Sequence, residues 1–110
     1  MLLTIVILFG IYYLYVNYKK TGIAGCNLQK SKSANRWISY NNEFNNSCDV
    51  TVLQREYNRM YSKQIGVTGI FDSETYQAVT PIFEKYFNKQ NVLGASFNNV
   101  YAALITFSEK

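Results

Sequence analysis

The feature that most constrains this chain is its first segment, which runs from Met1 to Val16 without a charged side chain. In an α-helix, the stretch through Tyr18 extends roughly 27 Å, close to the thickness of a bilayer's hydrocarbon core. Tyrosines gather at its C-terminal end, where aromatic rings favour the membrane–water interface. The sequence therefore predicts a transmembrane helix over residues 1–18.

Two other interpretations of this segment stay open. A cleaved secretory signal has basic residues before its apolar core, whereas here they come after it. The stretch Ile23-Ala24-Gly25-Cys26 has the residue types of a bacterial lipobox, but two lysines separate it from the apolar segment. Retention as a single-pass anchor is the prediction, in a bacterial inner membrane or the internal membrane of a virion.

The stretch after the anchor is basic and contains no acidic residue as far as position 36. The positive-inside rule then predicts that the rest of the chain faces the cytoplasm. In this interpretation the bilayer is a partner, and five residues lie at the membrane surface: Lys19, Lys20, Lys30, Lys32 and Arg36.

Two cysteines, Cys26 and Cys48, bracket a polar stretch. They are a candidate disulfide in an exported domain and two free thiols in a reducing cytoplasm, so both alternatives remain. The chain has no histidine, which excludes His-dependent catalysis and His-ligated metals. We expect no metal and no cofactor.

Residues 19–47 are expected to form a basic, Asn- and Ser-rich linker that is partly ordered, because Trp37 and Phe44 interrupt its polar composition. These aromatic side chains are expected to pack on the domain that follows. The alternative is that Trp37, with Arg36 and Lys32, forms an exposed contact for a partner.

Helical spacing begins after Asp49, a good N-cap residue, and continues through Val50, Leu53, Tyr57 and Met60. A loop follows in which Gly69 can adopt a positive φ. Asp72 or Ser73 can cap the next helix, which the Thr80-Pro81 pair is expected to end. Pro81 can open a third helix, and Ser96 can begin a last one.

The predicted fold is therefore all-α, with the single transmembrane helix followed by a bundle of three to four short helices over residues 48–110. Within it, residues 49–88 resemble the peptidoglycan-binding domain family, a small helical bundle. Two motifs carry the resemblance: Val50-x-x-Leu53-Gln54-x-x-Tyr57-Asn58-x-Met60, and Val67-Thr68-Gly69-Ile70-Phe71-Asp72-x-x-Thr75-x-x-Ala78-Val79-x-x-x-Phe83.

In the loop of this motif, Thr68 replaces the family's usual Asp, and Asp72 replaces its usual second Gly. The resemblance implies a shallow site for peptidoglycan beside this loop. The ligand-binding candidates that it suggests are Arg59, Thr68, Asp72 and Tyr76.

Catalysis is not expected, because no glutamate is placed by the pattern as a general acid with a second carboxylate beside it. Nucleic acid is not an expected partner, since the formal net charge of +4 arises mostly in the predicted linker. The predicted function is a membrane-anchored, non-catalytic binding or scaffolding protein. One alternative is a virion protein of a membrane-containing bacteriophage that links membrane to capsid or vertex, and another is a small accessory subunit of a membrane complex.

Overall fold

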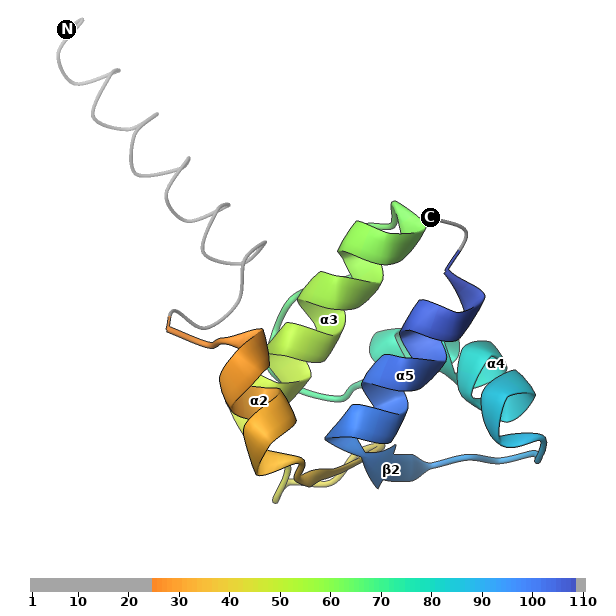
Figure 1. Cartoon of the computed structure of the whole chain (residues 1–110), viewed down its shortest axis with the longest axis horizontal. Helices are drawn as coiled ribbons and strands as arrows, with labels where there is room; N and C mark the ends of the chain where they lie inside the picture. Colours follow the sequence, from red (N-terminus) through yellow and green to blue (C-terminus); the bar gives the residue numbers. More distant parts are fainter. Residues whose placement is uncertain (1–24, 109–110) are drawn as a thin grey trace, which may run out of the picture.

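The computed structural model describes residues 25–108. In this part of the chain, helices α3 and α5 lie side by side and begin near the same end of the molecule, where β2 lies (Figure 1). Helix α2 packs against α3, and α4 packs against α5. The elements, in chain order, are α2 (Leu28–Ala34), β1 (Trp37–Ser39), α3 (Ser47–Tyr61), α4 (Ser73–Phe87), β2 (Gly94–Ser96) and α5 (Phe97–Phe107).

The all-α prediction is wrong, because β1 and β2 form a two-stranded antiparallel sheet. Ile38 pairs with Ala95 at its centre, and both side chains are buried. The neighbours of Ile38, Trp37 and Ser39, project to the opposite face, as the alternation of a strand requires. Both strands are three residues long and far apart in sequence, so no local pattern announces them.

Helix α3 begins earlier than predicted, because Asn46 and not Asp49 is its N-cap. The Asn46 side chain accepts hydrogen bonds from the backbone N–H groups of Cys48 and Asp49, at 3.0 and 3.2 Å. For α4, one of the two predicted caps is confirmed: the Asp72 side chain accepts from the Thr75 N–H at 3.0 Å. Side-chain oxygens at these positions satisfy N–H groups that have no partner within the helix.

The predicted break at Thr80-Pro81 is wrong, since α4 runs without interruption from Ser73 to Phe87 with Pro81 inside it. Proline removes one hydrogen bond of the helix and strains the preceding turn. Here the ring is exposed, while Val79 and Phe83 on either side are completely or almost completely buried. Burial of this apolar face outweighs the local preference of proline.

The core lies between α3, α4 and α5 and is closed at one end by the sheet. The apolar residues that the helical spacing predicts in α3 are confirmed as buried: Val50, Leu53, Tyr57 and Met60. The largest fully buried side chains around them come from the other elements and are Ile38, Phe83, Phe97 and Leu104. The sheet therefore contributes to the same core as the helices.

The single-pass membrane location also needs correction. Within residues 25–108, none of the helices has both the length and the apolar character that a bilayer crossing requires. The predicted anchor itself, residues 1–18, lies outside the described residues.

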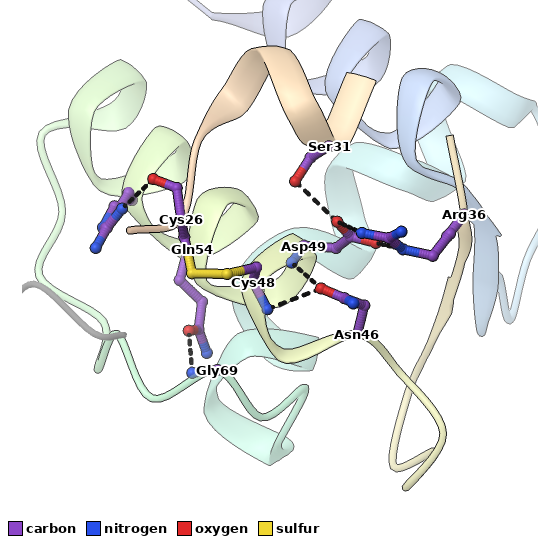
Figure 2. Close-up of a disulfide and its surroundings, with 9 residues drawn as sticks. Cys26, Ser31, Arg36, Asn46, Cys48, Asp49, Gln54 and Gly69 are labelled. Carbon is purple, nitrogen blue, oxygen red and sulfur yellow. Dashed lines mark hydrogen bonds and ion pairs between the residues drawn. A yellow bond between two sulfur atoms is a disulfide. The ribbon is translucent and has the colours of Figure 1, made fainter. Parts of the chain in front are cut away.

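Helix α2 is held on α3 by the side chain of Asp49, which is completely buried. It accepts hydrogen bonds from the Ser31 hydroxyl at 2.8 Å and from Nε and Nη2 of Arg36 at 2.9 and 3.1 Å (Figure 2). The hydrogen bond to Asp49 raises the pKa of Arg36. A buried carboxylate needs this full set of donors, and losing one of them leaves a desolvated charge.

A disulfide between Cys26 and Cys48 fixes the same two elements covalently. It joins the segment before α2 to the first turn of α3, with the two Cα atoms 5.0 Å apart (Figure 2). Nη1 of Arg55 donates a hydrogen bond to the Cys26 carbonyl oxygen at 3.2 Å. The bridge therefore encloses α2, β1 and the loop that leads to α3.

Replacing both cysteines, as Cys26→Ala with Cys48→Ala, should lower the free energy of unfolding by about 3 kcal/mol. The open chain gains conformational entropy when a loop of this length is no longer closed. Urea denaturation of both proteins measures the difference, and reduction of the unmodified protein should reproduce it. A difference below about 0.5 kcal/mol would show that the bridge does not constrain the unfolded chain.

Candidate functional site

The described residues form a concave feature, a cavity of about 760 Å³. It opens between the loop that follows β1 and the loop that precedes α4. Its volume is within the range of roughly 300–1,000 Å³ that is usual for small-molecule sites. The lining residues are Ser39, Asn41, Asn42, Glu43, Phe44, Asn45, Ser47, Gly69, Ile70 and Phe71.

The first wall of the cavity, residues 39–47, is held in shape by two asparagine side chains. Asn45 imitates a neighbouring strand, because its Oδ1 accepts from the Ser39 N–H at 3.0 Å and its Nδ2 donates to the Ser39 carbonyl at 2.7 Å. Asn42 donates to the Ser39 hydroxyl at 2.9 Å and accepts from the Phe44 N–H at 2.9 Å. Both amides are thus used to build the wall.

The second wall, residues 69–71, is held by one completely buried side chain, Gln54 of α3. Its Oε1 accepts hydrogen bonds from the Thr68 and Gly69 N–H groups at 2.9 and 3.0 Å. Its Nε2 donates to the Ile70 carbonyl at 3.0 Å and to the Thr75 hydroxyl at 2.9 Å. Figure 2 shows Gln54 reaching the Gly69 backbone from α3.

The loop accommodates these contacts because Gly69 adopts a φ of 78°, as the sequence predicts. One backbone bond then links the two walls, since the Asn41 N–H donates to the Phe71 carbonyl at 3.1 Å. The Phe71 side chain is buried next to Tyr40, whose ring stacks on that of Tyr76 at 4.3 Å between centroids. Of these three aromatic residues, Phe71 lines the cavity.

Two apolar side chains among the lining residues remain in solvent. Phe44 is 85 % exposed and Ile70 is 65 % exposed. Phe44 comes from the first wall and Ile70 from the second. An apolar ligand surface placed between them would remove both from water, which is favourable in proportion to the area covered.

The polar groups of the lining are mainly neutral. Asn41, Glu43 and Ser47 are exposed, and Glu43 is the only charged residue among the described residues of the lining. With no lysine or arginine in this lining, the cavity has no cation to neutralise a phosphate or carboxylate. The arrangement suits a neutral ligand that combines hydrogen-bonding groups with an apolar face.

The residues predicted to bind ligand lie near the second wall, with one exception, but none of them lines this cavity. Thr68 contributes to the network around Gln54, and Asp72 caps α4. Tyr76 is half-buried in its stack with Tyr40. In the structure these three side chains support the loop, and their contact with a ligand stays a prediction.

The fourth predicted residue, Arg59, lies apart in a smaller cavity of about 340 Å³ with Met60, Tyr101, Ile105 and Ser108. Its Nε pairs with Glu56 one turn earlier on α3, and this hydrogen bond raises the pKa of Arg59. The structure therefore does not bring Arg59 together with the other three residues.

Of the five basic residues predicted at a membrane surface, Lys19 and Lys20 lie outside the described residues. Lys30 is exposed on α2, and the ammonium group of Lys32 lies 5.4 Å from the centre of the Tyr101 ring. Arg36 is committed to Asp49. The last two side chains thus have contacts within the domain.

Sequence reasoning missed Phe44 and Ile70 as site residues. Phe44 is predicted to pack on the domain and Ile70 to fill the gap between helices beside the loop, whereas both side chains are exposed. The available signal was an aromatic residue within the polar stretch around positions 41–47, which does not by itself separate packing from exposure. In the part of the chain that the structure describes, no three His, Cys, Asp or Glu residues group in a way that could hold a metal ion.

Substituting Gln54→Leu should lower the free energy of unfolding by about 2–3 kcal/mol, because it leaves the Thr68 and Gly69 N–H groups without their acceptor. Gln77→Leu is the matched control, since Gln77 is exposed on α4 and should change stability by less than about 0.5 kcal/mol. Thermal and urea unfolding of the two variants measure the contrast. Equal stabilities would contradict the role given to Gln54.

No protein-family model matches the chain, and neither a curated protein nor a solved structure matches it significantly. The resemblance of residues 49–88 to the peptidoglycan-binding domain family therefore stays a prediction.

Proposed function

We propose that this chain carries a non-catalytic binding domain that takes a peptidoglycan-type glycan in the cavity between residues 39–47 and 69–71. The observation that carries the proposal is a cavity of about 760 Å³ with an 85 % exposed phenylalanine at its edge. Ligand sites are typically lined by apolar and aromatic side chains together with a few hydrogen-bonding groups.

A sugar ring suits this lining because it has apolar C–H faces and polar edges. Phe44 and Ile70 can cover a C–H face. The Asn41 amide and the Ser47 hydroxyl, both exposed, can exchange hydrogen bonds with sugar hydroxyl or acetamido groups. Since the lining has no cation, a neutral sugar suits it better than an acidic peptide.

Binding rather than catalysis is proposed because hydrolysis of a glycosidic bond ordinarily uses two carboxyl groups on either side of it. Among the described residues that line the cavity, Glu43 is the only carboxylate. A single carboxylate does not supply both the general acid and the second carboxyl group. Glu43 is instead a hydrogen-bond acceptor for the ligand.

The disulfide favours an exported domain over the two alternatives predicted for a cytoplasm-facing one, the virion linker and the accessory subunit. Disulfides persist in oxidising compartments and are rare in a reducing cytoplasm. An exported domain also lies outside the cytoplasm, in the compartment that contains peptidoglycan. The positive-inside rule predicted the opposite location, a domain facing the cytoplasm. That prediction depended in part on Arg36, which pairs with Asp49 within the domain.

Replacing Phe44→Ala should weaken binding of soluble peptidoglycan fragments on the order of tenfold, which corresponds to about 1.4 kcal/mol. Stability should change by less than about 0.5 kcal/mol, because the ring is largely in solvent. Isothermal titration calorimetry of the full chain with disaccharide–peptide fragments measures the affinity.

Ile105→Ala is the matched control for this experiment. Ile105 is 51 % exposed and lines the smaller cavity with Arg59, so its truncation should leave the affinity unchanged. The proposal fails if the unmodified chain binds no fragment. It also fails if Ile105→Ala lowers the affinity while Phe44→Ala does not, since the ligand would then occupy the other cavity.

A further inference from the structure

The outer face of the sheet carries an exposed tryptophan. Trp37 is 62 % exposed, whereas Ile38 next to it on β1 is completely buried. The indole lies over β2 at Gly94: a Cβ atom placed there would be 2.9 Å from the Trp37 Nε1 atom. Gly94 thus leaves room for the indole, and a side chain at that position would displace it.

This tryptophan adjoins the cavity through Ser39. Side chains two residues apart on a strand project from the same face, at a separation of roughly 6.6 Å along the strand. Ser39 lines the cavity and also lies against Gly94, at 2.7 Å from the Cβ position of that residue. Trp37, Ser39 and the cavity therefore form one continuous surface.

A further exposed apolar residue precedes β2. Leu93, immediately before β2, is 54 % exposed, and its carbonyl accepts a hydrogen bond from the Tyr40 N–H at 2.7 Å. That bond ties Leu93 to the chain between β1 and the cavity. Exposed apolar side chains thus lie both at the cavity, as Phe44 and Ile70, and on the sheet, as Trp37, a distribution that marks contact surfaces.

The charges next to this surface indicate which class of ligand can cover it. Arg36 precedes Trp37, but its guanidinium is bound to Asp49 through Nε and Nη2. No cation lines the cavity among the described residues, so polyanionic polymers gain no ion pair there. A neutral chain of sugars needs no ion pair, and the apolar ring faces that repeat along its length can cover both aromatic side chains.

We infer that the ligand is a neutral glycan chain several sugars long, with one ring against Phe44 in the cavity and a later ring stacked on Trp37. This inference rests on the proposed function and adds to it the length of the ligand and a second aromatic contact. A single disaccharide occupies the cavity alone. A longer oligomer of the same sugar also covers Trp37.

The chain offers a direct readout, because Trp37 is its only tryptophan. The full chain is titrated with β-1,4-linked N-acetylglucosamine dimer and hexamer, with intrinsic fluorescence and calorimetry recorded together. The hexamer should bind on the order of tenfold more tightly than the dimer. It alone should shift the tryptophan emission to shorter wavelength, as the indole leaves water.

Two variants separate the contributions. Trp37→Ala should bring the hexamer affinity down to that of the dimer and leave the dimer affinity unchanged, while Trp37→Phe should restore most of the difference. Phe44→Ala should weaken both oligomers, since both use the cavity. Melting temperatures of all variants should match that of the unmodified chain, because both rings are mostly in solvent.

Equal affinities for dimer and hexamer, with unchanged tryptophan emission, would overturn the extended surface while leaving the cavity as a binding site. Absence of binding by either oligomer, together with binding of disaccharide–peptide fragments, would also overturn the inference, because recognition would then depend on the peptide. Failure of all of these ligands would overturn the proposed function as well.

Discussion

The buried amide of Gln54 is the interaction on which the cavity depends. Its oxygen accepts two backbone N–H groups of the loop before α4, and its nitrogen donates to a carbonyl in the same loop and to Thr75 in α4. One side chain of α3 therefore fixes a loop and the start of another helix. A buried amide is costly unless its hydrogen bonds are made, so the loop and the glutamine specify each other. In consequence the second wall is set before any ligand arrives, which reduces the ordering cost of binding.

The first wall depends on a different set of constraints. The Cys26–Cys48 bridge and the Asp49 carboxylate hold the chain from α2 to the start of α3, and the wall lies within the loop that the bridge closes. Asn42 and Asn45 then supply the contacts that the short strand β1 cannot provide for itself. A small domain buries limited apolar area, and such polar and covalent links compensate for it. The exposed rings of Phe44 and Trp37 are therefore carried by a framework that does not need them for stability.

Local signals predicted the parts of the fold that are local. The buried residues of α3, the positive φ of Gly69 and the cap at Asp72 all follow from single residues or helical spacing. The sheet could not be predicted in this way, because Ile38 and Ala95 pair although most of the domain's sequence lies between them. Asn46 and Asp49 are both good cap residues, so the sequence does not separate them. In the structure Asn46 is the cap, and Asp49 lies inside the helix because its buried carboxylate pairs with Arg36. Pro81 was misread since tertiary burial overrode its propensity. The cavity could not be predicted, because an aromatic residue such as Phe44 in a polar stretch can be either packed or exposed, and here it is exposed.

The most direct test of this account is backbone amide hydrogen exchange at Thr68 and Gly69, two loop positions. If Gln54 holds the second wall as described, both amides should exchange only through global unfolding, at rates close to those of buried amides in α3. The amide of Gln64, an exposed position after the end of α3, should exchange much faster. Exchange at Thr68 and Gly69 as fast as at Gln64 would contradict the account, because the wall would then open independently of the fold.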